Sequence, residues 1–223
     1  KVFFGTGGSL ANDTAVRIIH FYFNRLGQHN KKKIIARTDA YHGSTYLAMS
    51  MTGITFNHQG FDLAPDLVHH IPAPNPYRRP AGMTESEFCD AKVNDLENKI
   101  IELGPENVAC FIAEPIMGAG GVIVPPDGYH KRTKEVCDNY EVLYISDEVI
   151  TGFGRLGHFF SSESVFNFVP DVITCAKGIS SGYLPLSATI LSDEMYDGIS
   201  VPQSDGALFT HGFTYSGHSV CCA

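Results

Sequence analysis

The sequence predicts an α/β fold in which a mostly parallel sheet is sandwiched between helices. Helical and strand patterns alternate along the chain. Three continuous apolar runs, at residues 108–113, 142–145 and 172–175, are typical of strands that are buried on both faces. Hydrophobic types make up 43% of the 223 residues, which is enough for the core of one large domain. We therefore treat residues 1–223 as a single domain.

The first third of the chain contains two predicted strands and two predicted helices. Residues 1–4 are expected to form a short strand, which ends at a glycine-rich turn, residues 5–8. A helix is expected over residues 9–26, where apolar residues recur at helical spacing and Gly27 ends the pattern. Residues 34–36 form the next strand candidate, and a polar turn at 41–44 leads into a helix over 45–51.

The remaining elements are longer or better separated. Residues 53–83 are rich in His, Pro, Asn and Gly, which predicts a long irregular stretch of the kind that is often functional. A helix is expected over 85–103, before the first of the three apolar strands, and another over 128–139, between the first and the second. The strand at 172–175 completes the predicted sheet.

Composition argues against several classes of function. The net charge of −8 is opposite to that of a nucleic-acid-binding protein, and the basic run at residues 31–33 is expected to be a solvated loop. No apolar run reaches the length of a membrane span, and the N-terminal residues lack a signal-peptide pattern. We therefore expect neither a nucleic-acid partner nor a membrane partner.

The cysteines and histidines do not suggest a metal site. The six cysteines have no CxxC or ligand spacing, which predicts reduced thiols in a cytoplasmic protein. His42 and the pair His69-His70 are not matched by a second cluster with ligand spacing. We expect no bound metal.

Polar residues follow four of the predicted strands. In sheets of this class, ligands bind beyond the carboxyl ends of the strands. The residues at these ends are Gly7-Gly8-Ser9, Glu114, Asp147 and Lys177. Together they would supply anion-binding amides, two carboxylates and one amine.

The glycine turn before the first helix suits a phosphate, because free backbone N–H groups and the positive helix end meet there. The alternative is a tight turn with Ser9 as an ordinary N-cap. Tyr41, after another strand, could stack on a planar cofactor or simply pack under a loop. Neither motif decides between its two interpretations alone.

Asp147 and Lys177 each end a buried apolar run. A buried carboxylate needs a cation or strong donors, and a protonated pyridine nitrogen would be such a cation; a structural Asp bonded to backbone N–H groups is the alternative. Desolvation would lower the pKa of Lys177 and give the neutral amine that attacks carbonyl groups. The alternative for Lys177 is an amine that reaches solvent at the sheet edge.

Taken together, the motifs resemble those of class III aminotransferases, especially the amine and ω-amino acid branch that uses pyruvate as acceptor. The resemblance covers essentially the whole chain. Its motifs are GSLANDTA at 8–15, AYHGST at 40–45, FIAEPIMGAGGVIVPPDGY at 111–129, YISDEVITGFGRLG at 144–157, DVITCAKGISSGYLP at 171–185 and THGFTYSGH at 210–218.

The resemblance implies a fold type I large domain that binds pyridoxal 5′-phosphate, with Lys177 holding the cofactor as a Schiff base and acting as a general base. Asp147 would pair with the pyridinium nitrogen. The other implied cofactor-binding residues are Gly8 and Ser9 at the phosphate, Tyr41 and Val149 on the ring faces, His42, Glu114, and Thr214 donated across a dimer interface. The implied partners are an amino donor, a 2-oxo acid and a second subunit, in a homodimer or a dimer of dimers.

The sequence also departs from the family pattern. Gly7, Leu10 and Ser219 stand where the family usually has Ser, Glu and Pro. These changes bear on cofactor affinity more than on reaction type, because neither Asp147 nor Lys177 is altered. Family members are considerably longer, so an N-terminal segment and a C-terminal small domain are expected to be absent from residues 1–223. A mutase or racemase of the same superfamily and an inert fragment stay open as alternatives.

Overall fold

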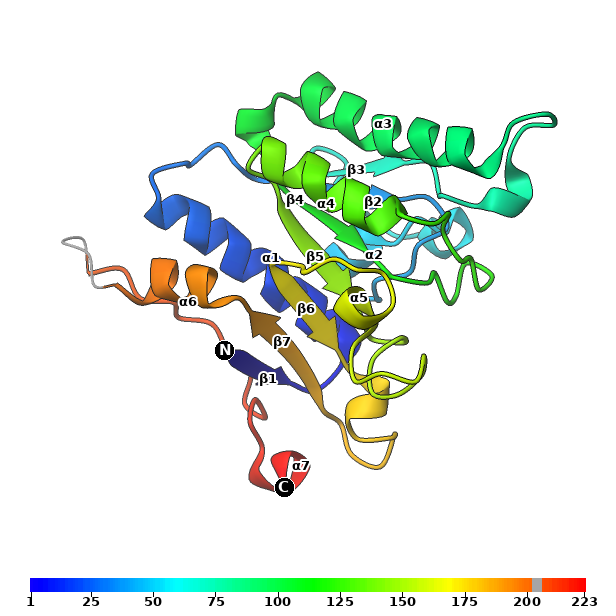
Figure 1. The fold of residues 1–223 in the computed structure, drawn as a ribbon. Coiled ribbons are helices and arrows are strands. Elements are labelled where there is room, and N and C mark those ends of the chain that lie inside the picture. The colour runs from blue at the N-terminus through cyan, green and yellow to red at the C-terminus, as the bar shows by residue number, and fades with distance from the viewer. Residues whose placement is uncertain (202–205) are drawn as a thin grey trace.

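The computed structural model describes residues 1–201 and 206–223. Its centre is a seven-stranded sheet with the order β1-β7-β6-β5-β4-β2-β3 (Figure 1). The strands are β1 (Val2–Gly5), β2 (Lys33–Arg37), β3 (Val68–Ile71), β4 (Val108–Ala113), β5 (Leu143–Asp147), β6 (Val172–Cys175) and β7 (Ser187–Leu191).

The sheet is mostly parallel, as predicted. Strands β3, β2, β4, β5 and β6 are paired in parallel, whereas β7 is antiparallel to both of its neighbours, β6 and β1. Strand β1 therefore points in the same direction as β6, and its carboxyl end lies at the same edge of the sheet as those of β4, β5 and β6. This direction is what brings the glycine turn to the edge where Glu114, Asp147 and Lys177 lie.

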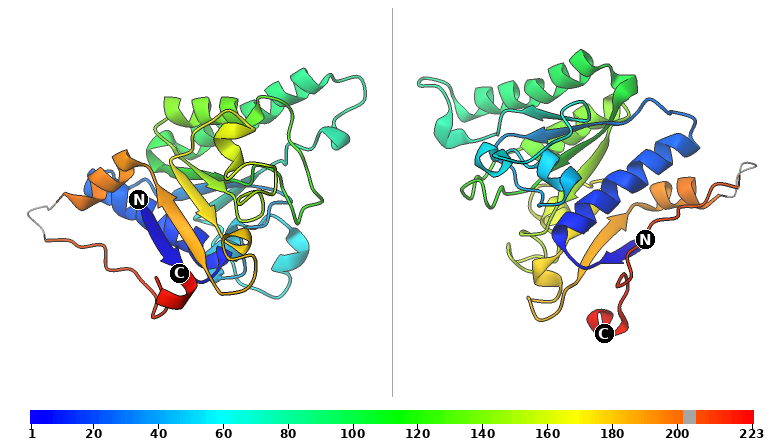
Figure 2. Two further views of the ribbon diagram at one scale, coloured as in Figure 1. Left: turned by 60° about the horizontal axis from the view of Figure 1, so that its bottom comes forward. Right: turned by 180° about the vertical axis from the view of Figure 1, so that it is seen from behind.

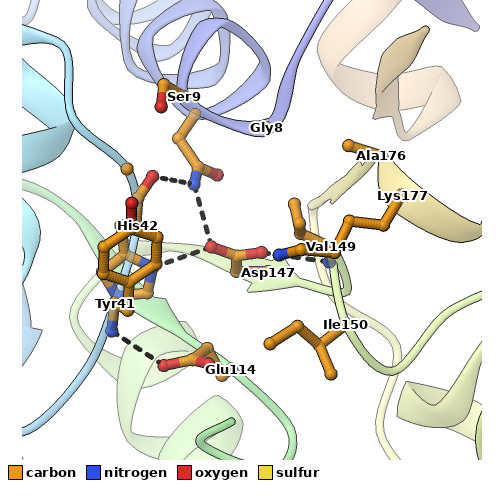
Figure 3. A pocket seen from close by; sticks show the side chains of 12 residues that line it. Gly8, Ser9, Tyr41, His42, Glu114, Asp147, Val149, Ile150, Ala176 and Lys177 are labelled. Carbon is orange, nitrogen blue, oxygen red and sulfur yellow. Dashed lines mark hydrogen bonds and ion pairs between the residues drawn. The ribbon is translucent and has the colours of Figure 1, made fainter. Parts of the chain in front are cut away.

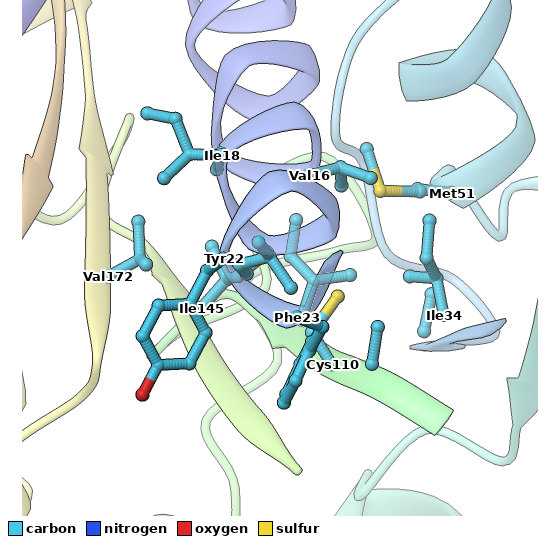
Figure 4. Packing of buried hydrophobic residues seen from close by; sticks show 14 of the residues in the cluster. Val16, Ile18, Tyr22, Phe23, Ile34, Met51, Cys110, Ile145 and Val172 are labelled. Carbon is cyan, nitrogen blue, oxygen red and sulfur yellow. The ribbon is translucent and has the colours of Figure 1, made fainter. Parts of the chain in front are cut away.

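Helices cover both faces of the sheet (Figures 1 and 2). One face packs against α1 (Gly8–Arg25), α2 (Tyr46–Met51) and α6 (Asp193–Ser200), and the other against α3 (Glu85–Leu103) and α4 (Tyr129–Asn139). In the first layer, Ile18 and Tyr22 of α1 pack in one cluster with Ile145 of β5 and Val172 of β6 (Figure 4). Two four-residue helices, α5 (Ser161–Ser164) and α7 (Ser219–Cys222), complete the α-helices of the described residues. Four 3-10 helices lie in the connections: η1 (Thr55–His58), η2 (Pro76–Arg78), η3 (Pro105–Asn107) and η4 (Lys177–Ile179).

Capping residues determine where helices α3 and α1 begin or end. A capping box starts α3, because Thr84 Oγ1 accepts from the Glu87 backbone N–H while the Glu87 carboxylate accepts from the Thr84 N–H. Gly104, with φ of +80°, ends this helix, and Pro105 cannot continue it. Helix α1 starts one residue earlier than expected, at Gly8, with extended Gly7 as its N-cap.

Two expectations were wrong, and two elements, β7 and α6, were not predicted. The stretch 53–83 is not wholly irregular, because it contains β3, which pairs with β2. Lys31 is not solvated, because the residue is buried and its amine donates a hydrogen bond of 2.6 Å to the carbonyl oxygen of Glu141, in the turn before β5. The six cysteines are all free, and no helix of the described residues is long and apolar enough to span a bilayer.

Candidate active site

A cavity of about 190 Å³ lies at the carboxyl edge of the sheet (Figure 3). Eight of the nine predicted site residues line it, drawn from five segments that are distant in sequence. The lining residues are Gly8, Ser9, Asn12, Tyr41, His42, Gly43, Glu114, Asp147, Val149, Ile150, Ala176 and Lys177. The sheet topology therefore brings together the groups that the sequence placed at separate strand ends.

Asp147 is the last residue of β5 and the centre of the site's hydrogen bonding. Its side chain is 3% exposed. Oδ2 accepts hydrogen bonds from Asn12 Nδ2 and His42 Nδ1, each at 2.8 Å, and Oδ1 accepts from the Val149 backbone N–H at 3.1 Å. A buried carboxylate is tolerated when strong donors surround it, and these three donors fix its orientation.

Asn12 was missed as a site residue, although it lies within the motif GSLANDTA. It is 1% exposed and extends from α1 across the sheet edge. Its Nδ2 donates to Asp147 and to the His42 carbonyl oxygen, and its Oδ1 accepts from Thr174 Oγ1 at 2.7 Å. The signal available in the sequence was a polar residue beside the apolar stripe of a buried helix.

His42 is buried beside Asp147 (Figure 3). Its backbone N–H donates to Thr52 Oγ1 at 2.9 Å, and its Nδ1 meets Asp147. Its Nε2 has no hydrogen-bond partner within residues 1–201 and 206–223 although the atom is buried. A buried nitrogen without a partner carries a desolvation cost, so this atom is an unsatisfied polar group in a residue that lines the cavity.

Glu114 follows β4 and holds two loops together. Oε1 accepts from the Tyr41 backbone N–H at 3.0 Å, and Oε2 accepts from the Gly118 N–H at 2.9 Å. Burial raises the pKa of this carboxyl, the Asp147 charge adds to the rise, and His42 and the two backbone donors oppose it. Glu114 therefore links the Tyr41 turn to the loop that follows β4.

The N-terminus of α1 is open toward the cavity. Ser9 is not the N-cap, which corrects that alternative: Ser9 Oγ accepts from the Ser44 backbone N–H at 3.0 Å, across the site. A Cβ on Gly8 would lie 3.2 Å from the Val149 methyl groups, so glycine here lets the helix end approach that side chain. A Cβ on Gly7 would meet nothing within 4 Å, so the serine usual at this position would fit.

Lys177 follows β6 and starts a short 3-10 turn, Lys177–Ile179. Its side chain extends into the cavity (Figure 3). The residue is exposed, so the desolvation expected from its place after a buried strand is not found in this chain. Its φ of +42° is rare for a residue with a side chain, and such strain is concentrated at functional sites.

Tyr41 and Val149 lie on the cavity wall on different elements. Tyr41 is half-buried, and its hydroxyl is 3.0 Å from Ser44 Oγ. Val149 follows Asp147 by two residues, and its backbone N–H binds that carboxylate. Thr214 does not line the cavity; it is exposed on the segment that follows residue 206. In the described residues, no group of three or more His, Cys, Asp or Glu is arranged to hold a metal ion.

Comparisons with known proteins agree on one family. A family model described as aminotransferase class-III matches residues 1–223. The chain is 48% identical over 224 residues to gamma aminobutyrate transaminase 3, chloroplastic, of Solanum lycopersicum, covering 100% of this chain and 43% of the relative. It is equally similar to the probable gamma-aminobutyrate transaminase 2, mitochondrial, of Oryza sativa subsp. indica, at 48% over 224 residues, covering 100% of this chain and 45% of that protein.

The fold agrees as well. The omega transaminase from Pseudomonas jessenii in complex with PMP superposes with a TM-score of 0.94 at 46% identity, covering 99% of this chain and 49% of that one. The chain thus spans less than half the length of the relatives it matches. With the whole chain matched by the family model and the fold shared, this protein belongs to the class III aminotransferases.

Proposed function

We propose that residues 1–223 form the pyridoxal-5′-phosphate-binding large domain of an aminotransferase. The reaction moves an amino group from an amine or ω-amino acid to a 2-oxo acid such as pyruvate. The observation that carries the proposal is that one cavity is lined both by the buried, triply bonded Asp147 and by the Lys177 amine. The relatives named as transaminases, and the neighbour named as a complex with PMP, support the same chemistry.

The residues present fit such a cofactor. The open α1 N-terminus offers backbone N–H groups for a phosphate, and no acidic side chain lies in its first turn. Gly43, with φ of +134°, lies where a Cβ would come within 2.3 Å of Ser9 Oγ, so the phosphate side of the cavity depends on glycine. The Asp147 carboxylate, which three hydrogen-bond donors hold in place, suits a protonated ring nitrogen.

The proposed contacts are those implied by the sequence. Asp147 would hold the ring nitrogen, and Lys177 the carbonyl carbon. Gly8 and Ser9 would bind the phosphate, Val149 and Tyr41 would contact the two ring faces, and His42 and Glu114 would support Asp147 and the Tyr41 turn. We also propose a homodimer or a dimer of dimers, in which Thr214 of the partner subunit reaches the phosphate.

Asp147 and Lys177 would have different roles in the reaction. The cofactor, when bound, supplies an electron sink for charge that develops at the substrate carbon. Asp147 would pair with the proton on the ring nitrogen, and the hydrogen bonds from Asn12, His42 and the Val149 N–H orient its carboxylate for that contact. The Lys177 amine would hold the cofactor, and as a general base it would move the proton at the substrate carbon, which is worth roughly 100- to 10,000-fold in rate.

A spectral experiment tests the proposal. The purified holoenzyme should absorb in the visible region as a protonated imine, and borohydride should fix a pyridoxyl group on the peptide that contains Lys177. Lys177→Arg should remove both signals while leaving the far-ultraviolet circular dichroism unchanged. A wild-type protein that is folded, binds no pyridoxal phosphate and gains no mass on reduction would overturn the proposal.

Product analysis separates transfer from rearrangement. A transaminase consumes one pyruvate for each amino donor, whereas a mutase or racemase converts its substrate without an acceptor. Stoichiometric alanine formation is therefore the expected result.

We further propose a cytoplasmic, reducing location, for which the six free cysteines are the support. The relatives named above are chloroplastic and mitochondrial, so fractionation of a cell that expresses the protein is the direct test.

A further inference from the structure

Arg37 is a buried cation to which the proposed function assigns no role. It is the last residue of β2 and is 0% exposed. None of the ion pairs formed by residues 1–201 and 206–223 includes it, and its Nε and Nη1 have no hydrogen-bond partner in these residues. Burying a cation without a carboxylate partner is unfavourable, so the contacts that Arg37 does make are expected to have a function.

The Arg37 guanidinium group holds the main chain at Glu114. Its Nη2 donates a hydrogen bond of 2.6 Å to the Glu114 carbonyl oxygen. Strands β2 and β4 are parallel neighbours, so the end of β2 lies beside the residue that follows β4. The guanidinium carbon is also 6.0 Å from the centroid of the Tyr129 ring, in α4. The Arg37 side chain therefore bridges the ends of two strands on the face of the sheet that α4 covers.

The next carbonyl along the chain is also held by a buried side chain. His130 Nε2 is 2.9 Å from the Pro115 carbonyl oxygen, and His130 Nδ1 is 2.8 Å from Tyr144 Oη. Burial lowers the pKa of His130 and the Arg37 cation adds to this shift, so the ring is neutral at neutral pH. Because a carbonyl oxygen only accepts, Nε2 carries the proton and Nδ1 accepts from Tyr144. Two buried side chains thus fix the successive carbonyls of Glu114 and Pro115.

A fixed main chain at Glu114 sets the direction of its carboxylate. Oε1 accepts from the Tyr41 backbone N–H at 3.0 Å, and Oε2 accepts from the Gly118 N–H at 2.9 Å (Figure 3). Arg37 and Tyr41 are the two ends of the short segment 37–41. Both ends of this segment therefore bind Glu114, one through its carbonyl oxygen and the other through its carboxylate.

The middle of the segment is in close contact with the loop that follows β4. Asp39 has a φ of +62°, and a Cβ on Gly120 would lie 2.2 Å from the Asp39 carbonyl oxygen. The two backbones thus lie directly against each other. A displacement of Glu114 would move the turn that carries Tyr41.

We propose that Arg37 is a positioning residue for the cofactor site. By holding the main chain at Glu114, it directs the Glu114 carboxylate to the Tyr41 N–H and so sets the place of the Tyr41 ring against the cofactor. The inference rests on the proposed function for the role of Tyr41. A guanidinium group suits this task, because a hydrogen bond from a cation to a carbonyl oxygen is stronger than one from a neutral donor.

The first test uses the cofactor-free protein and needs no ligand. Amide hydrogen exchange, followed by NMR, is measured at Tyr41 for wild type, Arg37→Met and the control Arg78→Met, an exposed arginine. The reference is the Ser161 N–H, which also donates to a buried carboxylate, that of Glu148. Arg37→Met should raise the exchange rate at Tyr41 about tenfold and leave that at Ser161 unchanged, and Arg78→Met should change neither rate.

A general loss of stability would give a different result. If Tyr41 and Ser161 exchanged faster by the same factor in Arg37→Met, Arg37 would stabilise the whole fold and the proposal would be wrong. An unchanged rate at Tyr41 would overturn it as well. Arg37→Lys, which keeps a cationic donor, should raise the Tyr41 rate by less than Arg37→Met does. If Arg37→Met does not fold, Arg37→Gln takes its place, and the same outcomes decide.

The second test measures the dissociation constant of pyridoxal phosphate by absorbance titration. Arg37→Met should raise this constant about tenfold in the wild-type background and less than about twofold in a Glu114→Gln background, because the effect passes through Glu114. Equal effects in the two backgrounds would overturn the role of Arg37 while the aminotransferase proposal stands. If wild type binds no pyridoxal phosphate, the proposed function fails, and the exchange rate at Tyr41 alone decides whether Arg37 positions the Tyr41 turn.

Discussion

Asn12 Nδ2 donates a hydrogen bond of 2.8 Å to Asp147 Oδ2, and both side chains are buried. Because Asn12 Oδ1 accepts from the Thr174 hydroxyl, the amide cannot rotate without losing both bonds. Helix α1 is thereby tied to the ends of β5 and β6 at the point where the candidate cofactor site lies. Asn12 is a positioning residue for Asp147.

Asn12→Leu should destabilise the cofactor-free protein by about 2 kcal/mol, because the buried Asp147 carboxylate loses a donor that no water replaces. Urea denaturation gives the free energy of unfolding. The same substitution at Asn94, an exposed position on α3, should change it by less than about 0.5 kcal/mol. Equal effects at the two positions would show that the Asn12 bond to Asp147 does not contribute.

Glu148→Gln should destabilise the loop after β5. The carboxylate accepts from five different donors, and a glutamine amide would place its own N–H groups against some of them. We expect a loss of about 2 kcal/mol in the free energy of unfolding, together with faster tryptic cleavage after Arg155. Glu163→Gln, an exposed control in α5, should leave both measurements unchanged, and a similar effect at Glu163 would contradict the explanation.

The sheet could largely be predicted because its central strands are continuous apolar runs that are buried on both faces. The strand Val68–Ile71 was missed because two half-buried histidines, His69 and His70, fill its centre, and the surrounding residues are typical of loops. Ser187–Leu191 was missed because Ser187 and Thr189 are polar although buried. Both strands form because they pair with strands that are distant in the sequence, and a local residue pattern does not encode such pairing.

The candidate site was predictable to the extent that strand ends define it. Glu114, Asp147 and Lys177 each follow an apolar run, and the direction of the strands brings them together. The partners of Asp147 were not predictable in the same way, since Asn12 and His42 are 135 and 105 residues away from it. The exposure of Lys177 was also not predicted, since its place after a buried strand suggested burial. The residue is exposed because it starts a turn that leaves the sheet.

His130 should make stability depend on pH. Burial, with the Arg37 cation nearby, lowers the pKa of His130 to about 3. Its ordinary value is near 6.5, so between these two values the unfolded chain takes up a proton that the folded chain does not. This contribution to stability is complete above pH 6.5 and is lost as the pH falls, by up to about 1.4 kcal/mol per pH unit.

His130→Gln should therefore show a shallower fall of the free energy of unfolding between pH 6 and about 4 than wild type does, whatever its stability at neutral pH. Chemical denaturation at a series of pH values measures the slope. His29→Gln, at an exposed position, is the matched control and should keep the wild-type slope. Parallel curves for His130→Gln and wild type would contradict the assignment of this pH dependence to His130.

The backbone at Lys177 predicts an unusual order of stabilities. At a φ of +42°, a Cβ crowds the backbone, and glycine avoids this cost of about 1 kcal/mol. Lys177→Gly should therefore be more stable than Lys177→Ala by about that amount, although both variants lose the amine. At Lys99, inside α3, the order should reverse, because glycine is less favourable than alanine in a helix by about 1 kcal/mol.

Thermal denaturation of the four cofactor-free variants measures both differences. If alanine were the more stable residue at both positions, the left-handed conformation of Lys177 would not be a strained feature of the folded chain. If the orders differ as expected, the chain has a lysine at a position where the backbone alone favours glycine. Strain of this kind is typical of residues with a chemical role.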